Sequence, residues 1–107
     1  MTARVETRAE DGSLHIALSG EIDLANAAAV EDEIREAVSH QPGAVSVDLT
    51  DLTYLDSAGI RTLFALASRL KPLRIVLELI VPLDSPTRRL IELSGFESLA
   101  AVRPANH

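Results

Sequence analysis

The chemical group that stands out in this 107-residue sequence is the hydroxyl of Ser57, which follows a carboxylate and precedes two small residues. The segment Leu55-Asp56-Ser57-Ala58-Gly59-Ile60 joins a predicted buried strand to a predicted helix. At a helix start, an oxygen on Ser57 lies beside unpaired N–H groups, where hydrogen bonding and the helix dipole favour negative charge. A phosphate adds roughly −1.5 to −2 charges. Phosphorylation there is expected to change the surface that a partner meets without unfolding the chain.

A purely structural role explains the same residues, because Asp56 or Ser57 is a suitable N-cap, a role worth roughly 1 kcal/mol. A second acidic strand-to-helix junction, Ser19 to Ala27, shifts the balance toward function. Its structural alternative is a turn at Gly20 with Asp23 or Asn26 capping the next helix. Taken together, the two junctions favour a binding surface.

Other chemistries lack the residues they need. His15, His40 and His107 are scattered without the i, i+3 or i, i+4 spacing of metal ligands. A serine hydrolase would need Gly-x-Ser-x-Gly and a histidine base, and neither accompanies Ser57. There is no Gly-x-x-x-x-Gly-Lys-[Ser/Thr] loop for nucleotide phosphates. We therefore expect no catalytic residue, no metal and no cofactor.

The composition argues against two classes of partner and indicates the compartment. The chain is 47% hydrophobic but only 3% aromatic, and its formal charge is −6, which repels phosphate backbones and anionic lipid heads. These features argue against nucleic acid and membrane surfaces as partners. The absence of cysteine, signal peptide and long apolar run fits a soluble cytoplasmic protein. The length predicts one domain over residues 1–107, with a frayed tail after about residue 103.

The helices and strands that position the two junctions are predicted from the periodicity of the hydrophobic residues and from the turn-forming residues between them. The order is β-β-α-β-α-β-α, which implies one sheet with helices packed on it. The expected elements are a hairpin of Val5–Arg8 and Leu14–Ser19, a helix from Asn26 to about His40, a strand over 44–49, a polar loop over 50–56, a helix from Ser57 to Lys71-Pro72, a strand over 74–81, and a helix begun by Asp84-Ser85-Pro86 and ended by Gly95.

Together these segments resemble the STAS domain (sulfate transporter and anti-sigma factor antagonist). The matching marks are Gly20-Glu21-Ile22-Asp23-Leu24, the strand ending in Asp48-Leu49, Asp56-Ser57-Ala58-Gly59-Ile60 with Leu63, and, less strongly, Leu90 to Phe96. Arg74 to Arg89 matches least, with Glu78, Pro82 and the Arg88-Arg89 pair outside the pattern. The resemblance implies an α/β STAS fold, a mixed sheet of four or five strands with helices mainly on one face.

The resemblance also implies a function, that of a free-standing bacterial anti-sigma factor antagonist. Such a protein binds a serine kinase that doubles as an anti-sigma factor, and the sigma factor is released. The kinase phosphorylates the serine matching Ser57 and switches binding off, and a PP2C-type serine phosphatase restores it. Asp56 matches the acidic neighbour, Gly59 a close backbone approach and Asp23 an interface residue. The partner contacts implied are Glu21, Asp23, Asp56, Ser57, Ala58 and Gly59, on a monomer or weak dimer.

Two other classes of function remain open from the sequence, beside the antagonist. A non-switching STAS subunit could dock to a transporter component or serve as a signalling scaffold. An enzyme using Ser57 as a nucleophile is the third class. Arg88 and Arg89 oppose the dipole in the first turn of the last helix, so they are either contacts for an acidic partner or solvated surface residues.

Overall fold

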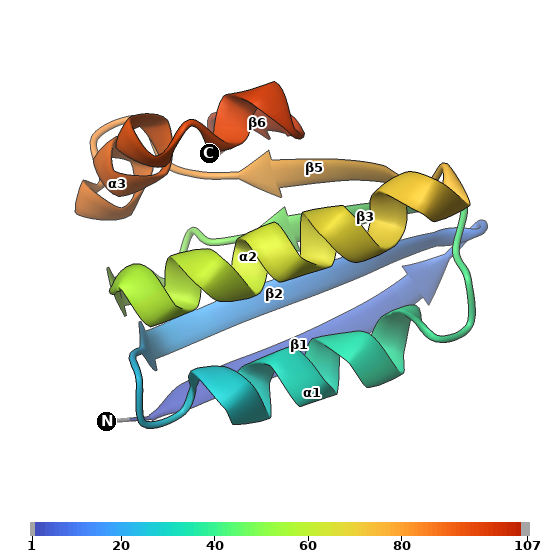
Figure 1. The fold of residues 1–107 in the computed structure, drawn as a ribbon, viewed down its shortest axis with the longest axis horizontal. Coiled ribbons are helices and arrows are strands. Elements are labelled where there is room, and N and C mark those ends of the chain that lie inside the picture. The colour runs from blue at the N-terminus through green and yellow to red at the C-terminus, as the bar shows by residue number, and fades with distance from the viewer. Residues whose placement is uncertain (1, 106–107) are drawn as a thin grey trace.

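The computed structural model describes residues 2–105 and has an α/β architecture in which one mixed sheet carries the helices on one face (Figure 1). The elements in chain order are β1 (Ala3–Glu10), β2 (Ser13–Ile22), α1 (Ala27–Val38), β3 (Ala44–Asp48), β4 (Leu52–Leu55), α2 (Ser57–Leu70), the 3-10 turn η1 (Lys71–Leu73), β5 (Val76–Ile80), α3 (Pro86–Ser94), the 3-10 turn η2 (Phe96–Ser98) and β6 (Ala101–Arg103).

The sheet has the order β1-β2-β3-β5-β6, with β4 paired to β2 off this path. The β1–β2 hairpin is antiparallel, and the other pairs are parallel. Because parallel strands end at one edge of a sheet, the carboxyl ends of β2 and β4 lie together, and Ile22 pairs with Leu55. This edge carries both acidic junctions found in the sequence.

The sheet has six strands where four or five were predicted, and two of them, β4 and β6, are missing from the expected element order. β4 lies inside the segment expected to be a polar loop, and its buried residues Leu52 and Leu55 are three apart, so the period-2 signal is missing. It joins the end of β2 past a register shift between Gly20 and Glu21. β6 has only three residues, too few to show a pattern. Hydrophobic periodicity therefore could not predict these two short strands.

The remaining differences lie at element ends. The hairpin strands extend to Ala3–Glu10 and Ser13–Ile22, and α1 ends at Val38. The strand predicted over 74–81 is Val76–Ile80, because Arg74 adopts a left-handed conformation that ends η1. Pro104 and Ala105 follow β6 without regular structure. The rest of the predicted frayed tail, residues 106–107, lies outside the described residues.

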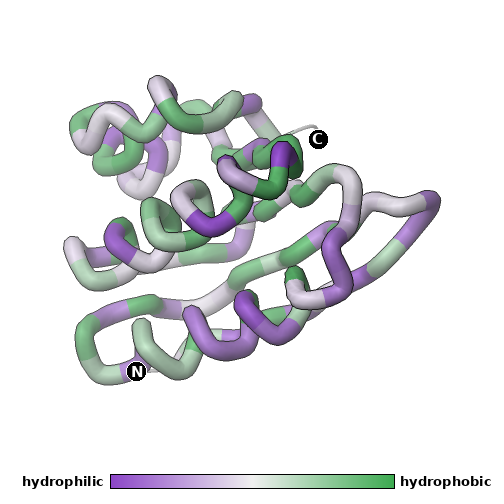
Figure 2. Tube along the Cα trace, turned by 45° about the vertical axis from the view of Figure 1, so that its right-hand side comes forward, coloured by the Kyte–Doolittle hydropathy of each residue, from purple (hydrophilic) through white to green (hydrophobic). Residues whose placement is uncertain are grey.

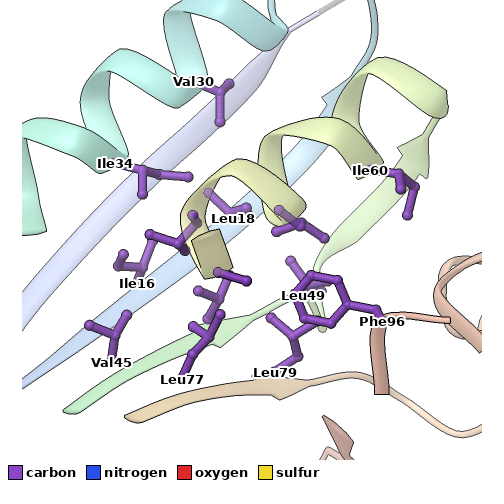
Figure 3. Close-up of a cluster of buried hydrophobic side chains, with 14 of the residues drawn as sticks. Ile16, Leu18, Val30, Ile34, Val45, Leu49, Ile60, Leu77, Leu79 and Phe96 are labelled. Carbon is purple, nitrogen blue, oxygen red and sulfur yellow. The ribbon is translucent and has the colours of Figure 1, made fainter. Parts of the chain in front are cut away.

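The core lies between the sheet and the helices (Figure 3). In β2 the side chains of Leu14, Ile16 and Leu18 are buried while those of His15 and Ala17 lie on the opposite face. Phe64 of α2 meets Phe96 edge to face, with ring centroids 5.2 Å apart, so η2 packs on the α2 side of the sheet. This arrangement confirms the expected packing of helices on one face.

The helices separate into apolar and polar sides. Val30 and Ile34 of α1 point into the core, while hydrophilic residues lie along its outer side (Figure 2). On that outer side, Arg35 pairs with Glu31 at 3.1 Å and with Asp32 at 3.3 Å. Within residues 2–105, no helix combines the length and apolar character needed to cross a membrane.

Candidate functional site

The start of α2 is capped by Asp56. Its backbone is extended, and its Oδ1 accepts hydrogen bonds from the N–H groups of Ala58 at 2.9 Å and Gly59 at 3.2 Å. Asp56 is thus the N-cap, and Ser57 is the first helical residue, with an exposed side chain. This geometry corrects one expectation: two of the first-turn N–H groups predicted to be free for a phosphate are already bonded to Asp56.

The approach to α1 is shaped by Gly20, which has a φ of 86°. A Cβ atom at this position would overlap the backbone carbonyl oxygen of Thr2. The next N–H, that of Glu21, donates to the same Thr2 carbonyl at 2.8 Å. Gly20 therefore lies within β2, at the register shift, and not in the turn drawn from the sequence as a structural alternative; both the left-handed backbone and the close approach require glycine there.

After the end of β2, Asp23 and Asn26 hold the shape of the loop that leads to α1. Asp23 Oδ1 accepts from the N–H of Ala25 at 2.9 Å, and Asn26 Oδ1 accepts from the N–H of Asp23 at 3.0 Å. The side-chain amide of Asn26 also donates to the carbonyl of Glu21 at 2.9 Å. Neither side chain caps α1, which corrects the structural alternative drawn from the sequence; instead the Ala27 N–H donates to the Asp23 carbonyl. Three side-chain hydrogen bonds thus connect residues within this loop and at the end of β2.

One carboxylate joins the two junctions. The N–H of Leu24 donates to Asp56 Oδ2 at 3.2 Å, while the N–H of Asp56 donates to the carbonyl of Ile22 at 3.3 Å. Asp56 therefore ties the loop before α1 to the first turn of α2. The two segments that the sequence singled out separately form one continuous surface.

Leu24 is a member of this surface that sequence reasoning did not single out. Its side chain is 79% exposed although it is large and apolar. Its backbone bond to Asp56 places it beside Ser57. The available signal was a large apolar residue directly after Asp23, between the end of β2 and the start of α1.

Ala58 and Gly59 are buried and serve to bring α2 close to the strand ends. A Cβ on Gly59 would overlap the end of the Leu55 side chain and would lie 3.1 Å from Ile22 Cγ2. Small residues here are thus explained by packing within this chain. Of the predicted contact residues, Ser57 is exposed, whereas Glu21, Asp23 and Asp56 are half-buried.

The electrostatic character of this surface is acidic. Asp23 and Asp56 lie by the start of α2, Glu21 lies near the end of β2, and no ion pair formed between described residues involves any of the three. Asp23 and Asp56 are held by backbone N–H groups instead. The surface offers hydrogen-bond acceptors, one hydroxyl and one leucine, which is a binding chemistry.

The other residues singled out from the sequence lie elsewhere. His15 Nδ1 is 2.7 Å from Ser46 Oγ on the uncovered face of the sheet, His40 is exposed, and His107 lies outside the described residues. Residues 2–105 contain no cluster of three or more metal-ligating side chains. Arg88 is largely buried and donates to the carbonyl of Val81 at 2.8 Å, so its role is structural, while Arg89 is exposed.

Comparison with known proteins places this arrangement in a family. The family model described as Mlab, STAS domain matches residues 5–102, and the chain belongs to the STAS domain family. It is 36% identical over 87 residues to the anti-sigma-F factor antagonist RsfB of Mycobacterium tuberculosis, a match that covers 81% of this chain and 70% of RsfB.

Solved structures give the same grouping. A crystal structure of an anti-sigma factor antagonist from Mycobacterium paratuberculosis superposes with a TM-score of 0.83 at 30% identity, covering 97% of this chain and 87% of that one. The phosphorylated form of the Bacillus cell fate determinant SpoIIAA has a TM-score of 0.69 at 19% identity, covering 99% of this chain and 93% of its own. At that identity the likeness to SpoIIAA concerns the fold, and the predicted STAS fold is confirmed.

Proposed function

We propose that this protein is an anti-sigma factor antagonist that binds its partner through the surface formed by Leu24 and the start of α2. Similarity to RsfB and to the Mycobacterium paratuberculosis protein supports this class of function. The observation that carries the proposal is the placement of an exposed serine at the first position of α2, next to a hydrogen-bonded acidic loop that carries an exposed leucine. Binding to the anti-sigma factor releases the sigma factor.

The second part of the proposal is that phosphorylation of Ser57 switches binding off. The Ala58 and Gly59 N–H groups are already bonded to Asp56, so a phosphate on Ser57 gains little from them and meets the neighbouring carboxylate. The dianion therefore stays exposed in the surface that the partner must cover. Burying an unpaired charge in an interface costs several kcal/mol. Phosphorylation thus acts on affinity rather than on folding.

The partners follow from this mechanism. The anti-sigma factor is a serine kinase that phosphorylates Ser57, and a PP2C-type serine phosphatase removes the phosphate. The contact residues proposed from the resemblance are Glu21, Asp23, Asp56, Ser57, Ala58 and Gly59. We add Leu24, because it is exposed and its N–H is bonded to Asp56. Ala58 and Gly59 are buried, so they act by shaping the backbone at the start of α2.

In this proposal Ser57 is the residue that the partner kinase phosphorylates. The chain itself binds its partner and does not catalyse a reaction. We propose a single STAS domain over residues 1–107. The competing class is a non-switching STAS subunit of a transporter or signalling scaffold. Genes for a sigma factor, a serine kinase or a PP2C-type phosphatase beside this one favour the switch, whereas transporter genes favour the competing class.

The direct test is to incubate the protein with serine kinases encoded in its genome and to map the phosphosite by mass spectrometry. Phosphate is expected on Ser57 and absent from the matched Ser57→Ala variant. Two other hydroxyls are less available, because Ser85 Oγ caps α3 and Thr87 is 4% exposed. Phosphate on Ser85 or Thr87 instead of Ser57 would overturn the assignment.

A further inference from the structure

The far end of α2 carries a second surface that has no part in the Ser57 site. A groove of about 400 Å³ lies where α2 ends and β5 begins, next to η2. Its walls include Leu70, Val76 and Leu99, and the last two are 65% and 42% exposed. β6 pairs only with residues 78–80 of β5, so within the described residues it does not reach the part of β5 that lines the groove. The result is an open apolar recess.

Two cations line this groove and no acid does. Lys71 and Arg74 are among its nine lining residues, and none of the nine is Asp or Glu. Within residues 2–105, neither cation takes part in an ion pair. The chain as a whole carries a charge of −6. An apolar recess with two uncompensated positive charges is thus a local exception on an acidic protein.

Arg74 occupies a backbone conformation that glycine would fill more easily. Its φ and ψ are 57° and 33°, and its N–H donates to the Lys71 carbonyl to end η1. Left-handed geometry at the end of a helix is the usual position of glycine, because a side chain is strained there. Arginine at this position makes the folded chain less stable than glycine would. This cost points to a use for the guanidinium of Arg74.

We propose that this groove is a second docking site, and that its occupant is an acidic, leucine-containing segment of a partner protein. The apolar walls receive the leucine side chains, and the two cations pair with the flanking carboxylates. A recessed shape suits a peptide better than a flat lipid surface. α2 has 14 residues and spans about 21 Å, so this site and Ser57 lie at opposite ends of the helix.

The probes are two acetylated seven-residue peptides, Glu-Leu-Glu-Glu-Leu-Leu-Glu and the same sequence with lysine for glutamate. Each is titrated into the ¹⁵N-labelled full chain and followed by NMR. The glutamate peptide is expected to shift the amides of Arg74, Val76 and Leu99, and the lysine peptide is not. Charge reversal by Lys71→Glu with Arg74→Glu is expected to exchange the preference of the two peptides. Equal shifts from both peptides, or shifts confined to the Ser57 end, would overturn the proposal.

Arg74→Gly separates docking from folding. It is expected to weaken binding of the glutamate peptide at least about tenfold while leaving the melting temperature unchanged or higher. Unchanged binding would contradict the role assigned to Arg74. Ser57→Asp should bind the peptide like wild type, so this result is independent of the proposed switch. Two other outcomes would contradict the stated occupant. One is binding of the protein to phosphatidylserine vesicles but not to the peptide. The other is disappearance of the NMR signals of the groove residues together with a dimer detected by sedimentation.

Discussion

The two strand-to-helix junctions of this protein use the same residue types for different purposes. At the first, Asp23 and Asn26 bond within their own loop and hold its shape. At the second, Asp56 bonds both to its own helix and across to Leu24 of the first junction. The acidic residues therefore build the surface, while the two side chains beside them that we propose as partner contacts, Leu24 and Ser57, are exposed. Within these junctions, the structural explanation applies to Asp23, Asn26 and Asp56, and the proposed binding role applies to Leu24 and Ser57.

The largest expected effect on stability comes from substituting a glycine, and it differs between the two junctions. Gly20→Ala should lower the free energy of unfolding by about 3 kcal/mol, because it combines positive-φ strain with overlap of a backbone carbonyl. Gly59→Ala should lower it by only about 1 kcal/mol, because the obstacle is the end of the Leu55 side chain and alanine favours the helix. Urea unfolding measures both. If Gly59→Ala were the more damaging of the two, our comparison of the junctions would be wrong.

The next effect concerns the link between the junctions. Asp56→Ala removes three hydrogen bonds and should lower the free energy of unfolding by about 2 kcal/mol. Asp56→Asn is the matched control, since it keeps an oxygen for the Ala58 and Gly59 N–H groups but turns an amide donor toward the Leu24 N–H. Its loss should be about half as large in the same unfolding measurement. No loss in Asp56→Asn would show that the bond to Leu24 contributes nothing.

A smaller effect tests Leu24 itself. Leu24→Ala should weaken binding of the anti-sigma factor about tenfold, or ~1.4 kcal/mol, with no change in melting temperature because the side chain is exposed. Leu73→Ala is the matched control, an exposed leucine beyond the far end of α2 that should leave this binding unchanged. Calorimetric titration compares the variants. Equal losses from both would mean that the contact is not local to the Ser57 end.

Much of this molecule could be predicted from its sequence because the long elements repeat their apolar residues regularly. The alternation of Leu14, Ile16 and Leu18 and the helical spacing of Val30 and Ile34 predicted which faces are buried. The strands missed, β4 and β6, have four and three residues, too few for a pattern. Strand pairing then decides where they lie, and pairing depends on residues far away in the chain.

The candidate site was predicted less completely. The residue types at Gly20, Asp23, Asp56 and Ser57 identified both junctions, but not the bond that joins them. The bond between Asp56 and Leu24 spans 32 positions and depends on β2 and β4 lying side by side. The bonds from the Ala58 and Gly59 N–H groups to Asp56 are local, in contrast, and they belong to the N-cap that the sequence offered as its structural alternative. Only the partner across the chain, Leu24, follows from the fold and not from local spacing.

The central claim is that Ser57 controls affinity and leaves the fold intact. Its most direct test is a calorimetric titration of the cognate anti-sigma factor with wild type, Ser57→Ala and Ser57→Asp, together with their melting temperatures. Ser57→Ala should bind like wild type, and Ser57→Asp should bind at least about 100-fold more weakly, since each ~1.4 kcal/mol is a factor of ten. All three should melt at nearly the same temperature. Wild-type affinity in Ser57→Asp would contradict the account.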